Sequence, residues 1–239
     1  MCLLALWVGR DADIPLIVAA NRDEFFGRPA AGPSEIESGI VAGKDLQAGG
    51  TWLGLNRHGL FVAVTNRREP VRTAESYSRG LLALEALRCG ALGCVEALVA
   101  RRTSERPLAG FNLVVVREGE GICFHWDGTL RPARFGPGLH VVSSNRDLDD
   151  DTMPEKKTVD VFDAALAALP DEAALAGLLR SHDGERPICK HEERYGTVSS
   201  TIYIGRRQAP RLLYADGASC VNAFRDYSAV LRSVGAPSA

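Results

Sequence analysis

Residues 1–28 read MCLLALWVGRDADIPLIVAANRDEFFGR, and the rest of the chain is organised around this segment. An apolar run at residues 3–8, a polar turn at 9–13 and a second apolar run at 16–20 lead into Asn21-Arg22-Asp23-Glu24. Two apolar runs joined by a short polar turn are typical of an antiparallel β-hairpin. Because a hairpin returns the end of its second strand to the start of its first, we expect residues 21–24 beside the start of the chain.

Cys2 is a candidate nucleophile at the start of this hairpin. If Met1 is removed, Cys2 carries a thiol nucleophile and a free α-amine, and an α-amine with a pKa of roughly 7.7–8.0 can act as a base near neutral pH. We expect Arg22 to favour the thiolate by its charge and Asp23 to hold the amine. The alternative is that Cys2 is a small apolar residue at the start of a buried strand, with Arg22 and Asp23 as a local ion pair.

Three further motifs lie along the chain, namely Gly49-Gly50-Thr51-Trp52-Leu53-Gly54, Val64-Thr65-Asn66-Arg67 and Tyr195-Gly196-Thr197. Together with Met-Cys and Asn21–Glu24 they resemble the NRDE family, the transport and Golgi organisation protein 2 homologues. The sequence plan is similar to that of N-terminal-nucleophile hydrolases, above all the cysteine-type acylases that cleave penicillin V and conjugated bile acids. The resemblance implies an α+β fold, a four-layer αββα sandwich of two mainly antiparallel sheets, in a single domain over residues 1–239.

The resemblance also implies a set of catalytic residues, which are Cys2, Arg22, Asp23, Asn66 and Asn145. The charged Glu24 departs from it, because the bile-acid-cleaving enzymes carry a more apolar residue there. A second carboxylate at this point could bind a cationic group or oppose formation of a thiolate.

An Asn-Arg pair ends three of the expected strands, at Asn21-Arg22, Asn66-Arg67 and Asn145-Arg146. If these strands lie side by side, the three asparagines line one rim; the alternative is that Asn is simply common at strand ends. Asn66 and Asn145 suit the stabilisation of a developing oxyanion or the orientation of substrate.

Four further residues are the candidates for substrate binding, namely Asn21, Glu24, Trp52 and Arg194. For Trp52 a place in the core or at its rim is the favoured alternative to stacking on a substrate.

The strand and helix patterns support two stacked layers. Residues 3–6, 16–19 and 113–116 are apolar without alternation, which indicates strands that are covered on both faces. Helices are expected in two consecutive pairs between groups of strands, which fits a sandwich better than the competing doubly wound parallel sheet. Residues 27–50, rich in Gly, Pro and Ala, are expected to form a long loop beside the site.

Composition narrows the function classes. The 239 residues are 46% hydrophobic and 24% charged, with a formal net charge of −2, which argues against a general nucleic-acid or anionic-membrane surface. Apolar runs are too short for a membrane span or a signal peptide, so we expect a cytoplasmic protein. Its six cysteines show no Cys-x-x-Cys spacing and no paired histidine, so we expect free, mostly buried thiols, no zinc site, and a solvated pair in His182 and His191.

Two functions follow from these observations. The first is hydrolysis of a small-molecule, non-peptide amide C–N bond by Cys2, with its own α-amine as the base and no cofactor required. The second is non-catalytic binding or trafficking of haem or an acyl lipid, because the eukaryotic relatives are linked to haem trafficking and lipid metabolism. Haem would need an axial ligand, for which His58, His140 and Cys2 are the candidates. Neither the substrate nor the oligomeric state follows from the sequence.

Overall fold

A computed structural model describes residues 3–165 and 171–234, which fall into two compact units. Unit 1 combines Met1–Arg28 with Pro137–Ala229, and unit 2 combines Pro29–Gly136 with Val230–Ala239. Cys2 lies outside the described residues, as do Leu166 and Leu169, whose apolar spacing with Val159 and Phe162 predicts one face of a helix. The single domain over residues 1–239 stays a prediction beside this division.

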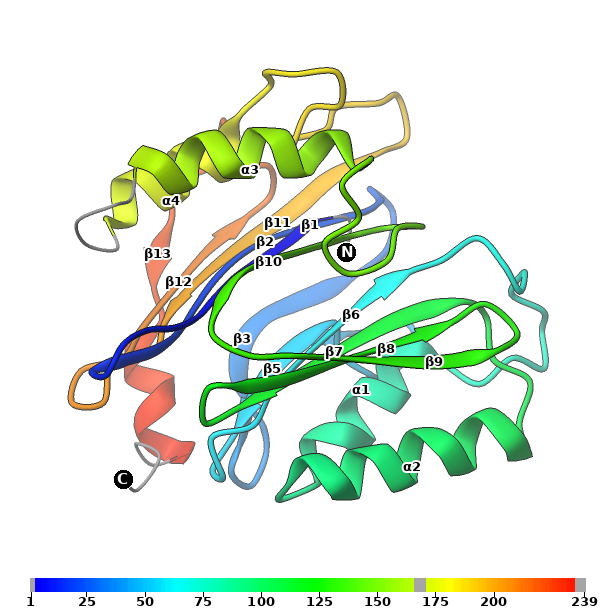
Figure 1. Ribbon diagram of the computed structural model, residues 1–239. Helices are drawn as coiled ribbons and strands as arrows, with labels where there is room; N and C mark the ends of the chain where they lie inside the picture. Colours follow the sequence, from blue (N-terminus) through cyan, green and yellow to red (C-terminus); the bar gives the residue numbers. More distant parts are fainter. Residues whose placement is uncertain (1–2, 166–170, 235–239) are drawn as a thin grey trace. The chain divides into compact units, whose positions relative to one another are not determined.

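Unit 1 is built on a six-stranded sheet in the order β10-β1-β2-β11-β12-β13 (Figure 1). Its strands are β1 (Leu3–Asp11), β2 (Ile14–Phe25), β10 (Gly138–Ser143), β11 (Tyr195–Ile204), β12 (Arg211–Asp216) and β13 (Arg225–Asp226). The predicted hairpin is confirmed, because β1 and β2 pair antiparallel with Leu3 opposite Asn21. Neighbouring residues such as Leu3 and Leu4 are both buried, which explains the absence of alternation in these strands.

Two helices, α3 (Pro154–Ala165) and α4 (Glu172–Arg180), cover one face of this sheet (Figure 1). The Asp171 side chain caps α4 by accepting a hydrogen bond from the Ala173 amide. Leu175 and Leu178 on α4 pack into the core cluster that contains Leu3 of β1. A 3-10 helix, η1 (Ser228–Val234), follows β13.

Unit 2 contains a seven-stranded sheet in the order β3-β4-β5-β6-β7-β8-β9. Its strands are β3 (Ala30–Glu37), β4 (Ile40–Asp45), β5 (Leu53–Asn56), β6 (Phe61–Asn66), β7 (Phe111–Arg117), β8 (Glu120–Trp126) and β9 (Leu130–Phe135). The long loop expected over residues 27–50 is wrong, because β3 and β4 form a hairpin there. Gly39 makes its turn with φ +76°, and β3 is a partly exposed edge strand with register shifts, which weakens its alternation.

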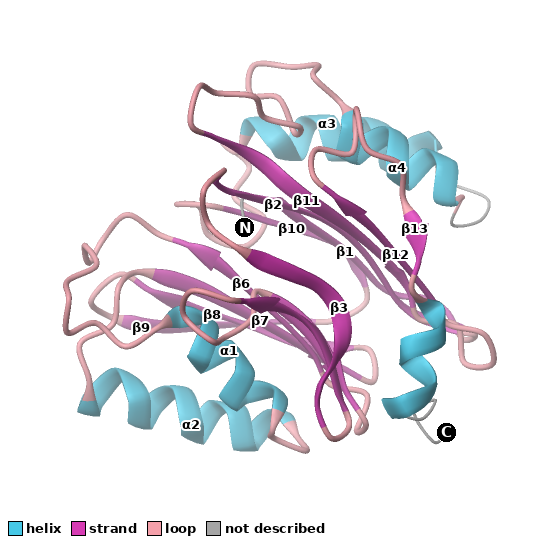
Figure 2. Cartoon of the chain, turned by 180° about the vertical axis from the view of Figure 1, so that it is seen from behind, coloured by secondary structure: helices cyan, strands magenta, loops and turns pink. Residues whose placement is uncertain are grey.

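Helices α1 (Arg79–Leu87) and α2 (Leu92–Glu105) cover one face of the unit 2 sheet (Figure 2). Arg102 of α2 donates two hydrogen bonds to Glu85 of α1, at 2.9 Å and 2.6 Å, and so joins the two helices. Cys89 and Cys94 are linked by a disulfide across the turn between these helices. The expectation that all six cysteines are free is therefore wrong, and Cys94 is exposed.

The observed pairings settle the fold class. Every pairing between the strands described above is antiparallel, so the competing doubly wound parallel sheet is wrong. The chain is an α+β protein of two antiparallel sheets, each with its own pair of helices.

Candidate active site

The start of β1 lies between β2 and the end of β10 in unit 1. Leu3 pairs with Asn21 of β2 on one side and with Ser143 of β10 on the other. Arg22, the next residue of β2, is buried, although it carries a charge. Asn21 of β2 and the end of β10 therefore flank Leu3, the residue bonded to Cys2.

Asn21 fastens β2 to the helix layer of its unit. Its side chain is fully buried, and its Nδ2 donates to the carbonyl oxygens of Leu179 at 2.9 Å and Ile188 at 3.0 Å. Its Oδ1 accepts a hydrogen bond from Ser200 Oγ at 2.6 Å. This placement gives Asn21 a structural role, and substrate binding by Asn21 stays a prediction.

Asp23 is buried and contacts two polar side chains. Its Oδ1 accepts a hydrogen bond from Thr197 Oγ1 at 2.7 Å, and its Oδ2 forms an ion pair with Lys190 Nζ at 3.2 Å. Lys190 Nζ also lies 4.0 Å from the buried carboxylate of Glu155. The Asp23 charge is thus balanced inside unit 1 by a lysine from the loop before β11.

A β-bulge in β11 lies opposite Arg22 and Asp23. The register of β11 shifts between Thr197, which pairs with Asp23, and Ser199, which pairs with Arg22. Bulges re-aim side chains and are frequent beside active sites. Since successive strand residues point to opposite faces, Arg22 and Asp23 serve different faces of the sheet.

Glu24 and Arg194 lie nearer the surface. Glu24 Oε2 is 3.7 Å from Arg28 Nε, so the Arg28 guanidinium partly offsets the negative charge of Glu24. The carbonyl of Arg194 accepts a hydrogen bond from the Phe26 amide at 3.1 Å, while its side chain is exposed. Their substrate-binding roles stay predictions.

The three asparagines expected on one rim do not belong to one sheet. Asn145 follows β10 in unit 1, where it is exposed and has a left-handed backbone with φ +66°. Asn66 ends β6 in the sheet of unit 2, so the expectation of adjacent strands is wrong for it. Trp52 also lies in unit 2, buried beside Gly43, where an added Cβ would meet its ring.

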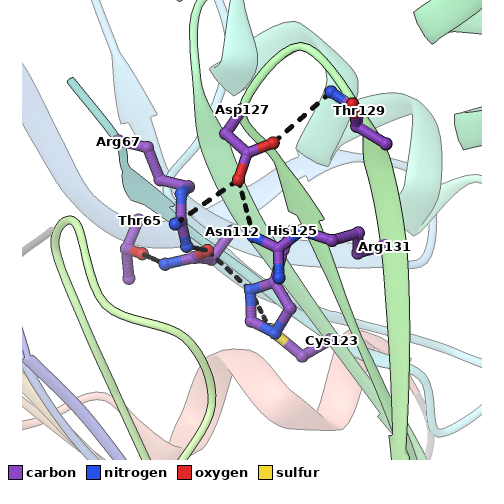
Figure 3. A network of polar contacts seen from close by, with 8 residues as sticks. All are labelled: Thr65, Arg67, Asn112, Cys123, His125, Asp127, Thr129 and Arg131. Atoms are coloured by element: carbon purple, nitrogen blue, oxygen red, sulfur yellow. Dashed lines mark hydrogen bonds and ion pairs between the residues drawn. The ribbon is translucent and has the colours of Figure 1, made fainter. Parts of the chain in front are cut away.

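A polar network in unit 2 includes Arg67 of the second Asn-Arg pair (Figure 3). Asn112 Oδ1 accepts from Arg67 Nη1 at 3.0 Å and lies 2.8 Å from His125 Nδ1, while Asn112 Nδ2 donates to Thr65 Oγ1. Because a carbonyl oxygen only accepts, His125 Nδ1 carries the hydrogen. The carboxylate of Asp127 lies 3.8 Å from Arg67. This network therefore holds the side chain of Arg67, the residue that follows Asn66.

Sequence reasoning missed the central members of this network. Asn112 and His125 are single polar residues inside apolar strands, and they face each other only through the pairing of β7 with β8. Their one signal in the sequence is a polar residue inside an otherwise apolar run. Such a residue needs a buried partner.

A second missed feature is the Cys–His cluster, formed by His182, Cys189, His191 and Cys220 of unit 1. The expectation of cysteines without paired histidines is wrong here, because His191 Nε2 lies 3.6 Å from Cys189 Sγ and 3.1 Å from Cys220 Sγ. Burial and the neighbouring Cys220 thiol raise the pKa of Cys189 to about 11. Cys189 is therefore a protonated thiol at neutral pH and a poor candidate for the nucleophile.

The histidines considered for haem lie in different surroundings. His58 is exposed in the turn before β6. His140 Nδ1 lies 2.7 Å from Asp149 Oδ2 in unit 1. Among the residues that the structure describes, no helix combines the length and the apolar character needed to cross a membrane.

Solved structures with the same fold include hydrolases. The Caenorhabditis elegans N-acylethanolamine-hydrolyzing acid amidase ortholog matches with a TM-score of 0.62 at 12% identity, over 85% of this chain and 92% of that chain. A C2A mutant of conjugated bile acid hydrolase from Clostridium perfringens matches with a TM-score of 0.50 at 10% identity, over 95% and 96%. The N-terminal-nucleophile hydrolase fold class predicted from the sequence is thereby confirmed.

Curated relatives carry the family resemblance. The Transport and Golgi organization 2 homolog of Mus musculus is 31% identical over 140 residues, which cover 54% of this chain and 50% of the relative. The homolog of Homo sapiens is 32% identical over 140 residues, with the same coverage. The chain thus aligns with about half the length of the curated relatives it matches. A family model described as Transport and Golgi organisation 2 matches residues 1–214, and the chain belongs to this family.

Proposed function

We propose that this protein is an amide hydrolase in which Cys2, freed of Met1, is the nucleophile. The observation that carries the proposal is the position of Leu3 between Asn21 and Ser143, beside the buried Arg22. If β1 keeps its alternation for one more residue, position 2 falls on the face of Leu4 and Arg22. A buried guanidinium on that face would favour a thiolate.

The proposed chemistry has two steps. The α-amine of Cys2 takes the thiol proton, the sulfur attacks the amide carbon, and the C–N bond breaks as the amine leaves with that proton. Water then attacks the thioester, which releases the acid and restores the thiol. Asn145 is the proposed donor to the oxyanion in unit 1, and Asn66 keeps this role as a prediction from the resemblance.

The similarity of fold to known hydrolases supports this reaction class. The two solved structures named above are described as an amidase and a hydrolase of conjugated bile acid. At 10–12% identity they share the fold alone, so the analogy supports the reaction class and leaves the substrate open. That Asp23 holds the α-amine stays a prediction, and its contacts with Lys190 and Thr197 anchor the end of β2 that carries Arg22.

The test is turnover of a panel of N-acyl amides by protein whose loss of Met1 has been confirmed by mass spectrometry. We expect Cys2→Ser to lower turnover by about 100-fold or more, because a serine hydroxyl is a far poorer nucleophile at neutral pH. Cys123→Ser is the matched control, since Cys123 is a buried thiol of unit 2. Equal turnover by wild type and Cys2→Ser on a confirmed substrate would remove Cys2 from the mechanism.

A cytoplasmic location is part of the same proposal. Fractionation of cells that express the full chain tests it, and recovery in a membrane pellet would contradict it.

A further inference from the structure

Four potential metal ligands converge in unit 1 at a point that the proposed reaction does not use. The ligand atoms of the Cys–His cluster all lie within 4.8 Å of one another. They come from three segments: His182 follows α4, Cys189 and His191 lie on the loop before β11, and Cys220 follows β12. Two thiols and two imidazoles form a complete ligand set for a structural zinc site.

The spacing of these atoms matches the edges of a small tetrahedron. Zinc–sulfur bonds of about 2.3 Å and zinc–nitrogen bonds of about 2.0–2.1 Å place two sulfurs about 3.8 Å apart and a sulfur and a nitrogen about 3.5 Å apart. Cys189 Sγ and Cys220 Sγ are 3.6 Å apart, and His191 Nε2 lies 3.6 Å and 3.1 Å from them. The ring of His182 is 5.2 Å from that of His191 between centroids, so small rotations would complete the set.

One backbone hydrogen bond and one side-chain hydrogen bond already hold the three segments together. The Cys189 amide donates to the carbonyl of Ser181 at 2.9 Å, which joins the loop to the residue before His182. Arg180 Nε donates to the carbonyl of Ser219 at 2.9 Å, which joins the end of α4 to the residue before Cys220. The ligands are therefore pre-positioned, which lowers the entropy cost of binding an ion.

We propose that the Cys–His cluster binds one zinc ion in a closed structural site. Thiolate and imidazole ligands select zinc over magnesium and calcium, which prefer oxygen. Two thiolates neutralise the divalent charge, and four protein ligands leave no open position for catalysis. The ion would hold the loop that supplies Lys190 to Asp23 and the Ile188 carbonyl to Asn21.

The experiment uses the full chain produced in zinc-supplemented medium and dialysed against a mild chelator. We expect about one equivalent of zinc by elemental analysis, and an X-ray absorption spectrum with two sulfur and two nitrogen neighbours. The cobalt-substituted protein should show the intense visible bands of a tetrahedral ion with thiolate ligands. Zinc content below about a tenth of an equivalent together with no tetrahedral cobalt spectrum would overturn the proposal.

Variants identify the ligands. Cys220→Ser and His191→Ala should each weaken zinc binding by at least about 100-fold. Cys123→Ser, which removes a thiol beside the histidine of the unit 2 network, should bind zinc as wild type does. Zinc retained at wild-type affinity by Cys220→Ser would contradict the assignment, as would a Cys189–Cys220 disulfide in the non-reduced peptide map. If a variant fails to fold, the zinc content and cobalt spectrum of the wild-type chain still decide.

Discussion

Asn145 allows a test of its side chain without a change in the backbone. Its φ of +66° is a conformation that Gly adopts freely and that costs most other residues roughly 1–2 kcal/mol. We expect Asn145→Gly to have a free energy of unfolding about 1 kcal/mol higher than that of Asn145→Ala, because both remove the side-chain amide and only Gly adopts this backbone conformation without strain. If the proposed function holds, Asn145→Gly should also lose about 100-fold in amide turnover.

Urea unfolding and amide turnover of the two variants separate these effects. Full turnover by Asn145→Gly would show that its amide plays no part in catalysis, while the stability prediction would stand on its own.

Lys190 is the second residue whose removal gives a specific expectation. Lys190→Met keeps the aliphatic stem but leaves the buried carboxylate of Asp23 without its cation, so we expect a loss of about 3 kcal/mol in unfolding free energy. Lys156→Met is the control, because Lys156 pairs with the exposed Asp160 and should lose less than about 1 kcal/mol. Equal losses in the two variants, measured by urea unfolding at neutral pH, would contradict the buried ion pair.

Contacts between individual residues were the hardest feature to predict from the sequence. The position of Asn21-Arg22-Asp23-Glu24 beside the start of β1 could be predicted, because hairpin geometry is local. That Asp23 pairs with Lys190 could not be predicted, since it depends on the bulge in β11 and on a loop far along the chain. The Cys–His cluster was missed for the same reason, because the two strands β11 and β12 separate His182 from Cys220 in the sequence.

At the scale of elements, the contact between α1 and α2 should stabilise the protein to a degree that depends on pH. Burial raises the pKa of Glu85, but the hydrogen bonds from Arg102 and Tyr77 outweigh it, and the net pKa is below the ordinary 4.5. A depressed folded pKa means that the stabilisation is complete above about pH 4.5 and is lost as the pH falls through the folded pKa. We expect Glu85→Gln to cost roughly 1–2 kcal/mol at neutral pH and much less in acid.

Denaturant unfolding of the wild type and Glu85→Gln across this pH range measures the difference. Glu105→Gln is the matched control, since Glu105 meets Arg102 at 3.7 Å with an exposed side chain and should change stability little. A constant difference between wild type and Glu85→Gln down to strong acid would refute the assignment.

Element prediction succeeded where the sequence pattern was strong. The hairpin of β1 and β2 and the helices α1 and α2 follow from apolar runs with clear lengths and spacings. The hairpin of β3 and β4 was missed, because an edge strand with a Gly-Pro pair at residues 32–33 has the composition of a loop.

For the whole molecule, the division of unit 1 between two parts of the chain has a direct consequence for fragments. β1 and β2 lie between β10 and β11 in its sheet, so residues 137–229 alone lack the two strands that join the sheet together. We expect this fragment to remain unfolded, with low dispersion in its amide NMR spectrum and no cooperative thermal transition. The full chain is the control, and a cooperative transition in the fragment would contradict the expectation.

The pairing of β2 with β11 also sets a timetable for synthesis. Asn21 and Ser200, which face each other across these strands, are 179 residues apart in the chain. At roughly 5–20 residues per second, a translating ribosome delivers β11 about 10–35 s after β2. During that interval the apolar β2 has an open edge, which invites pairing with other chains. Nascent chains stalled before residue 195 should therefore bind chaperones and be cleaved readily by protease, and protection equal to that of the released protein would refute this.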